Sequence, residues 1–413
     1  MLDRDHCQRL DAADPLAGLR DAFELPPGVI YLDGNSLGPL AKNARRNLAS
    51  TLEEEWARRL ILGWTESGWL AAPQRVGDRI GGLIGAAPGQ VVVSDNTTVN
   101  LYKLATSALA IRPERTTILI QDEDFPTDRF VAGGVAAASS GRVQVRQFEP
   151  DGMAAALGPD TALVILSHVD YGTGRLHDMP ALTQTVHLAG ALVLWDLSHS
   201  AGAVPVALDS CEVDFAAGCT YKFLNGGPGS PAYCYVARRL QSGARSPIWS
   251  WLGHADPFAF GPSYEPGPGP KSFITGTPGI LGLAALEGAL QVWDGVDLAL
   301  LRRKALDLAD TFVALVEARC AGSGLELLTP REPEARGSQV SWRHPQAQKI
   351  VTELIGRGVI GDFRPPNIAR FGLTPLYLGF EDVWRAVEQL CSVLDGLAAG
   401  EPNVAAGAVP QTP

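Results

Sequence analysis

Short apolar segments alternate with helical patterns between residues 90 and 236, and this alternation most limits what the chain can fold into. The segments are short, rich in Val, Ile and Leu, and bounded by turn residues. The predicted strands are residues 90–94, 117–121, 143–148, 162–168, 191–196, 214–219 and 232–236. Strands that alternate with helices form largely parallel sheets. The sequence therefore predicts an α/β domain with a mostly parallel seven-stranded sheet flanked by helices.

The later part of the chain has a different pattern. A Pro/Gly-rich stretch, residues 261–272, predicts a loop, and a helical run follows from Pro278. Apolar residues at helical spacing predict a second helix over residues 296–321. A strand at 337–342, helices at 345–355 and 381–398, and the segment IARFG at 368–372 predict a smaller α+β domain after it.

Composition excludes several functional classes. The 413 residues carry a formal net charge of −11, which argues against nucleic acid or an anionic membrane as the main partner. No apolar run reaches membrane-spanning length, and the N-terminus lacks a signal-type segment, so we expect a cytoplasmic protein. The six cysteines are scattered without CxxC or Cys/His pairing, which predicts reduced thiols and no metal site.

Lys222 lies between a short apolar segment and a glycine-rich loop, in CTYKFLNGGPGS. A lysine that forms an imine must lose its proton, which burial or a nearby cation favours by lowering its pKa. Taken alone, Lys222 would be a solvated lysine at a strand end. Asp196 changes that interpretation, because it ends a predicted strand where parallel sheets bind ligands and could pair with a pyridinium nitrogen. Asp196 could also cap a helix, and His199 is either a ligand contact or a structural histidine.

Two upstream segments add to this pattern. In SDNTTVNLYK a strand ends and a helix begins, so backbone N–H groups and the Thr97 and Thr98 hydroxyls could cradle a phosphate. Helix capping by Asn96 or Thr97 is the alternative. In DEDFPTDR, Phe125 follows a strand, where its ring could stack on a planar cofactor or fill the core.

Together these segments resemble the kynureninase family of fold-type I pyridoxal-phosphate enzymes. The motifs LDGNSLG, FPTD, WDLSHSAGAVPV, CTYKFLNGGPGS, SWLGH, RGSQVS and GVIGDFRPPNIARFG occur in this order. The resemblance implies a pyridoxal 5′-phosphate cofactor and hydrolysis of L-kynurenine, with 3-hydroxykynurenine as a second possible substrate, to anthranilate and L-alanine. It also implies a homodimer with shared active sites.

The resemblance further implies a domain arrangement. Residues 1–45 contribute to the small domain and the active site, 46–295 form the large cofactor-binding domain, and 296–400 form the small domain. Residues 401–413 lack periodicity, so we expect them to be disordered.

By motif, Lys222 is the lysine that binds the cofactor covalently, Asp196 is the partner of its ring nitrogen, and Tyr221 is a phosphate ligand and proton donor. The other residues expected around the cofactor are Thr97, Thr98, Phe125, Pro126, Thr127, Asp128, Ser167, His199, Trp251 and Thr277. Trp251 and Thr277 would come from the neighbouring subunit. N-capping is the alternative role of Thr277.

Substrate recognition calls for an arginine, because guanidinium binds a carboxylate through two hydrogen bonds. Arg370 matches the carboxylate-binding arginine of the family, and Arg364 is the second candidate. The other expected substrate contacts are Trp64, Asn35, Ser36 and His199. Trp64 and Thr277 favour plain kynurenine over its hydroxylated form.

The nearest alternative is another fold-type I enzyme, such as a cysteine desulfurase or an aminotransferase. A desulfurase needs a nucleophilic cysteine on a mobile loop, whereas Cys320 and Cys391 are predicted in helices. A desulfurase would also usually carry His in place of Tyr221. A non-catalytic ligand-binding protein of the same fold is the second alternative, and the presence of Asp196, Lys222 and Arg370 argues against it.

Overall fold

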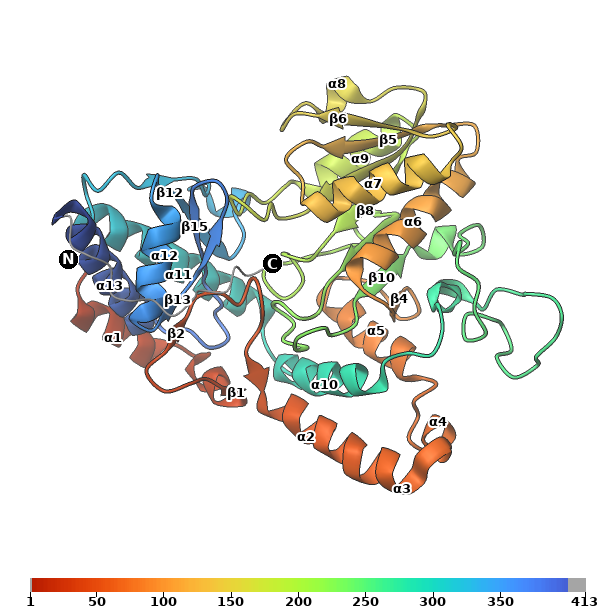
Figure 1. Ribbon diagram of the computed structural model, residues 1–413, viewed down its shortest axis with the longest axis horizontal. Helices are drawn as coiled ribbons and strands as arrows, with labels where there is room; N and C mark the ends of the chain where they lie inside the picture. Colours follow the sequence, from red (N-terminus) through yellow and green to blue (C-terminus); the bar gives the residue numbers. More distant parts are fainter. Residues whose placement is uncertain (1, 400–413) are drawn as a thin grey trace. The chain divides into compact units, whose positions relative to one another are not determined.

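The computed structural model describes residues 2–399 and divides into two compact units (Figure 1). The large unit comprises Ala44–Asp170 and His177–Leu290. The small unit comprises the residues before Ala44, the segment Tyr171–Leu176 and the residues from Gln291 onward. The tail at 401–413, for which the sequence predicts disorder, lies outside the described residues.

A seven-stranded sheet is the centre of the large unit, in the order β4-β10-β9-β8-β7-β5-β6. Only β10 runs antiparallel to its neighbours β4 and β9, so the prediction of a mostly parallel sheet is confirmed. All seven predicted strands occur: β4 (Val91–Val93), β5 (Thr117–Gln121), β6 (Gln144–Phe148), β7 (Thr161–Ser167), β8 (Leu192–Asp196), β9 (Phe215–Gly218) and β10 (Tyr233–Val236). Parallel sheets bind ligands at the carboxyl ends of their strands, which is where β7, β8 and β9 carry the predicted site residues.

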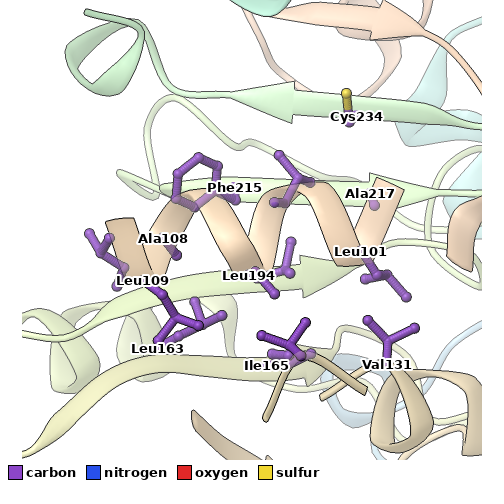
Figure 2. Packing of buried hydrophobic residues seen from close by; sticks show 14 of the residues in the cluster. Leu101, Ala108, Leu109, Val131, Leu163, Ile165, Leu194, Phe215, Ala217 and Cys234 are labelled. Atoms are coloured by element: carbon purple, nitrogen blue, oxygen red, sulfur yellow. The ribbon is translucent and has the colours of Figure 1, made fainter. Parts of the chain in front are cut away.

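Helices pack on this sheet through their apolar faces, as α6 (Thr97–Ile111) illustrates. Its buried residues Leu101, Leu104, Ala105 and Ala108 recur at the spacing of one helix face. Figure 2 shows α6 packed on side chains of the sheet such as Phe215. The other helices around the unit are α2 (Lys42–Ser50), the π-helical η2 (Thr51–Trp56), α3 (Ala57–Arg59), η3 (Leu60–Leu62), α4 (Gly63–Glu66), α5 (Ala72–Leu83), α7 (Pro126–Ala138), α8 (Met153–Ala156), α9 (Met179–Leu188), η4 (Arg238–Leu240), η5 (Gly269–Phe273) and α10 (Ile280–Leu290).

The small unit has a four-stranded antiparallel sheet in the order β11-β12-β15-β14, with β11 (Glu326–Leu327), β12 (Gln339–Arg343), β14 (Asp362–Arg364) and β15 (Ile368–Gly372). Two short pairs accompany it: β1 (Phe23–Glu24) with β3 (Leu40–Ala41), and β2 (Ile30–Tyr31) with β13 (Val359–Ile360). Its helices are α1 (Arg4–Ala13), η1 (Ala17–Ala22), η6 (Gln291–Trp293), α11 (Leu298–Arg319), η7 (Pro333–Ala335), α12 (Ala347–Gly356) and α13 (Phe380–Ala399). In the part of the chain that the structure describes, no helix has both the length and the apolar character to cross a bilayer.

Candidate active site

Lys222 lies in the loop that follows β9. Its Nζ atom is 2.9 Å from Nε2 of His199, 5.8 Å from the centre of the Phe125 ring and 5.9 Å from the centre of the Tyr221 ring. The side chain is half-buried. The solvated strand-end lysine that the local sequence favours is therefore not what the structure shows, and four predicted site residues are brought together here.

The glycine-rich loop after Lys222 closes tightly on itself. The Gly226 N–H donates to the Thr220 carbonyl oxygen at 2.9 Å, and Thr220 Oγ1 donates to the Pro231 carbonyl oxygen at 2.7 Å. A Cβ atom at Gly226 would lie 2.4 Å from Oγ of Ser230. A side chain at this position would clash with Ser230, so this close approach within the loop requires glycine.

Three buried carboxyl groups gather at the ends of β7 and β8. Asp196 ends β8, and its Oδ1 accepts a hydrogen bond from the Ser198 N–H at 2.7 Å. Asp128, in the first turn of α7, hydrogen-bonds to Asp196 and lies 3.5 Å from Oγ of Ser167. Asp124 accepts the Ser167 N–H at 3.2 Å. Because β7 and β8 pair with Ser167 opposite Asp196, the sheet register itself holds this group together.

The electrostatics of these carboxyl groups indicate a cationic ligand. Burial, with the charges of Asp196 and Asp124, raises the pKa of Asp128 well above its ordinary value, while Lys222 opposes this rise. Burial, with a contribution from Asp196, raises the pKa of Asp124 to about 7. Asp128 Oδ1 is buried and has no hydrogen-bond partner. A protonated ring nitrogen would relieve this excess of buried carboxylate, so the residues fit a pyridinium cofactor.

The N-terminus of α6 leaves its two threonines available for another role. Asn96 caps the helix, since its side chain accepts the Val99 N–H at 3.0 Å. The capping role that the sequence left open between Asn96 and Thr97 therefore belongs to Asn96. Thr97 is half-buried, Thr98 is exposed, and their N–H groups lie in the first turn, where a helix supplies no carbonyl partner.

Three of the residues predicted to surround the cofactor, Phe125, Pro126 and Thr127, lie at the start of α7. Phe125 directly precedes the helix, and Pro126 occupies one of its first two positions, where its missing N–H costs nothing. Thr127 is half-buried beside them.

Aromatic side chains form a connected set elsewhere in the large unit. Trp64, on α4, makes edge contacts with Trp69 and Trp251 at centroid distances of 5.7 and 6.4 Å. Trp251 also contacts Phe258 at 5.9 Å. The predicted residues Trp64 and Trp251 are thus in contact with each other within one chain.

Thr277 is exposed and lines a cavity of about 340 Å³ together with Asp95 and Gly229. Helix α10 begins at Ile280, so Thr277 does not occupy its N-cap position.

The predicted substrate residues of the small unit surround one carboxylate, Asp362. Arg370 donates to it twice, through Nε at 2.8 Å and Nη2 at 2.5 Å, and also donates to Oγ of Ser36 at 2.9 Å. Arg364 forms an ion pair with the same carboxylate at 2.7 Å. Arg370 further donates to the carbonyl oxygen of Tyr171 at 2.6 Å. The Arg370 side chain is 1% exposed and that of Arg364 is 14% exposed, so the second candidate is the more accessible guanidinium.

Asn35 is fully buried, and neither of its side-chain polar atoms has a hydrogen-bond partner in the described structure. A Cβ atom at Gly372, the last residue of β15, would lie 2.1 Å from Oδ1 of Asn35. Only glycine at position 372 therefore lets the Asn35 side chain pack this closely against β15.

Sequence reasoning missed several charged residues that the structure places at these sites. Asp124 and Asp362 each lie within a quoted motif, yet neither was singled out. Asp33, in LDGNSLG, is buried, and burial together with the charge of Asp362 raises its pKa to about 7. These three aspartates could have been identified from the sequence, because each lies close to predicted site residues within a quoted motif. Among the described residues, no group of three or more His, Cys, Asp or Glu side chains could hold a metal ion.

The desulfurase alternative finds no support in the cysteines. Cys320 directly follows α11 and is buried, and Cys391 lies within α13. Cys320 is thus buried where the helix ends and Cys391 is part of a helix, so neither thiol is presented on an exposed loop as a nucleophile would be.

Solved structures share this architecture. A structure of C-DES with glycine covalently linked to its PLP cofactor matches with a TM-score of 0.75 at 19% identity, covering 90% of this chain and 98% of the other. The cysteine desulfurase CsdA of Escherichia coli matches with a TM-score of 0.76 at 17% identity, covering 94% and 99%. These likenesses confirm the predicted fold-type I architecture.

Sequence comparison gives a closer relationship. The kynureninase C-terminal domain family matches residues 301–390. A kynureninase of Burkholderia pseudomallei is 48% identical over 410 residues, which cover 98% of this chain and 99% of the relative. A kynureninase of Pseudomonas fluorescens is 47% identical over 400 residues, 96% of each chain. With this identity over almost its whole length, the chain belongs to the kynureninase family.

Proposed function

We propose that the protein hydrolyses L-kynurenine to anthranilate and L-alanine with pyridoxal 5′-phosphate as its cofactor. The observation that carries this proposal is the similarity to kynureninases at 47–48% identity over nearly the full length. The half-buried Lys222 and the buried carboxyl groups near it supply the chemistry that such a reaction needs.

The large unit would hold the cofactor. Lys222 would bind it covalently, Asp196 would pair with its ring nitrogen, and Phe125 would stack on the ring. Tyr221 and the first turn of α6, with Thr97 and Thr98, would bind its phosphate. When bound, pyridoxal phosphate withdraws electrons from the substrate Cα atom.

The protein groups would then move the protons. Lys222, released by the substrate amine, would take the proton from Cα, and its hydrogen bond to His199 would orient it. Asp128 and Ser167 would hold Asp196 in place through the contacts described above. Tyr221 would protonate Cβ after the carbon–carbon bond breaks.

The small unit would bind the α-carboxylate of the substrate through Arg370, with Arg364 as the second candidate. Asn35 and Ser36 are proposed contacts of the same substrate. In the large unit, Trp64 would pack on the aryl ring, and Trp251 and Thr277 would complete the pocket of a neighbouring subunit. We also propose the domain limits expected from the sequence: 1–45 with 296–400, and 46–295.

We further propose a homodimer. Trp56, Leu60 and Ile61 form an exposed apolar run in the large unit, and Phe258 and Phe260 are exposed near Trp251. Apolar exposure of this extent is typical of subunit contacts. A cytoplasmic location is supported by the six cysteines, all of which are free.

Purified protein incubated with pyridoxal phosphate tests the function directly. L-Kynurenine should yield fluorescent anthranilate, and a parallel reaction with 3-hydroxykynurenine should be slower. Lys222→Ala should abolish both the visible absorption of the bound cofactor and the turnover. A colourless wild-type protein would contradict the cofactor assignment, whereas a coloured protein that forms no anthranilate would contradict only the substrate. Keto-acid-dependent consumption of an amino donor would instead indicate an aminotransferase.

A further inference from the structure

Lys103 is fully buried within α6, one face of which is apolar. A lysine is almost never completely buried unless it is paired. Its Nζ atom donates to Oδ2 of Asp95 at 2.6 Å and to the carbonyl oxygen of Phe273 at 2.6 Å. Because helical side chains point toward the N-terminus, Lys103 reaches back to the residue that precedes the helix cap.

Asp95 has a backbone conformation that L-residues rarely adopt, with φ at +54°. Its carboxylate accepts hydrogen bonds from Ser94 Oγ at 2.7 Å and from Thr275 Oγ1, in addition to the Lys103 ammonium. Although burial opposes ionisation, Lys103 and these hydroxyls lower the pKa of Asp95. The side chain thus makes contacts that a glycine, the usual residue at positive φ, could not make.

The conformation of Asp95 sets the direction in which the chain leaves β4 and enters α6. Asn96, the cap, and Thr97 and Thr98 follow it directly. The same carboxylate holds Thr275, and Thr277, two residues later, lines the cavity of about 340 Å³ that Asp95 also lines. One ion pair, between the buried Lys103 and the partly buried Asp95, is therefore connected to both segments that the proposed function assigns to the cofactor.

We propose that Lys103 and Asp95 are positioning residues: they hold the Thr97–Thr98 turn in place for the cofactor phosphate of the same subunit, and the loop carrying Thr277 in place for the pocket of a neighbouring subunit. This inference rests on the proposed function, since it presupposes that pyridoxal phosphate binds. Neither residue needs to touch the cofactor. Its consequence is specific: loss of the ion pair should weaken binding of the phosphate and leave binding of the pyridine ring largely intact.

The experiment compares two ligands that differ only in the phosphate. Full-length protein freed of cofactor is titrated with pyridoxal phosphate and with pyridoxal, with binding followed by visible absorption. Lys103→Met should lower the affinity for pyridoxal phosphate by about 10- to 100-fold, the range for a lost charged hydrogen bond. Its affinity for pyridoxal should change by less than about threefold. Thr275→Val, which keeps the ion pair, should show the same selectivity with a smaller loss, and it decides the question if Lys103→Met does not fold.

Lys304→Met is the matched control. Lys304 is paired with Asp14 at 2.7 Å in the small unit, and both side chains are buried. This variant should lose stability without changing the ratio of the two affinities. The inference would be overturned if the folded Lys103 and Thr275 variants kept the wild-type ratio of the affinity for pyridoxal phosphate to the affinity for pyridoxal. A wild-type protein that binds neither ligand would instead contradict the proposed function.

Discussion

Asp362 pairs with the buried guanidinium group of Arg370 and the partly buried one of Arg364, and its replacement gives the sharpest test of the small unit. Its carboxylate accepts both Nε and Nη2 of Arg370, Nη2 of Arg364 and the Ser36 hydroxyl. Asp362→Asn keeps the size of the side chain and removes its charge. The two guanidinium cations would then lie close together without the carboxylate anion that neutralises them.

The expected loss of stability follows from this burial. Asp362 and Arg370 are each 1% exposed, so solvent screens the pair little. Removing one partner of a buried ion pair costs about 3–5 kcal/mol, because the other charge is left uncompensated. For a cooperative unit of 150–250 residues, this corresponds to a fall in Tm of roughly 6–20 °C. Urea and thermal unfolding followed by far-ultraviolet circular dichroism would measure it.

An exposed ion pair in the same sheet provides the control. Glu326 and Arg343 lie 2.9 Å apart with side chains 62% and 46% exposed. Glu326→Gln should therefore change the free energy of unfolding by less than about 1 kcal/mol. If Asp362→Asn lost no more stability than Glu326→Gln, the buried carboxylate would not be what holds the arginines, and our account of the network would be refuted.

Three further predictions follow from the site. Tyr221→Phe should lower kcat by about 100-fold or more while the bound cofactor keeps its visible absorption; unchanged turnover would exclude Tyr221 as the proton donor. Since burial and the charge of Asp362 raise the pKa of Asp33 to about 7, native Asp33 keeps its proton between about pH 4 and 7, where the unfolded chain releases it. Stability should therefore fall as pH rises through this window, and Asp33→Asn should reduce that fall in urea unfolding at several pH values; an identical pH slope would contradict the assignment. Trp64→Ala should raise KM for kynurenine about tenfold, whereas Trp384→Ala, on α13, should leave KM within about twofold; equal effects would remove Trp64 from the substrate site.

The strands of the sheets were the most predictable part of the fold. The strand at 117–121 has the predicted bounds, because a short apolar run between turn residues specifies a buried strand locally. Helix α1 was not predicted, since only Cys7 of its ten residues is buried and its polar sequence shows no apolar face. Its N-cap, Asp3, is a signal that the sequence did contain.

The site residues that could be predicted are those that lie in recognisable sequence motifs. Lys222 and Asp196 were identified from their positions at strand ends and from the family resemblance. The partners Asp124, Asp362 and Lys103 were not, because a charged residue that will be buried looks in sequence like one that stays solvated. Their roles depend on chain segments far away, such as Phe273, which meets Lys103 across 170 residues.

The small unit is assembled from three separate stretches of chain, and this affects the order in which the protein can fold on the ribosome. Strand β2 at Ile30–Tyr31 pairs with β13 at Val359–Ile360, about 330 residues later. At roughly 5–20 residues per second, the first strand waits about 15–65 s for its partner to be synthesised. The large unit, complete at Leu290, can fold during that interval. Nascent chains stalled just before β13 is synthesised should therefore contain a protease-resistant large unit and a cleavable N-terminal segment.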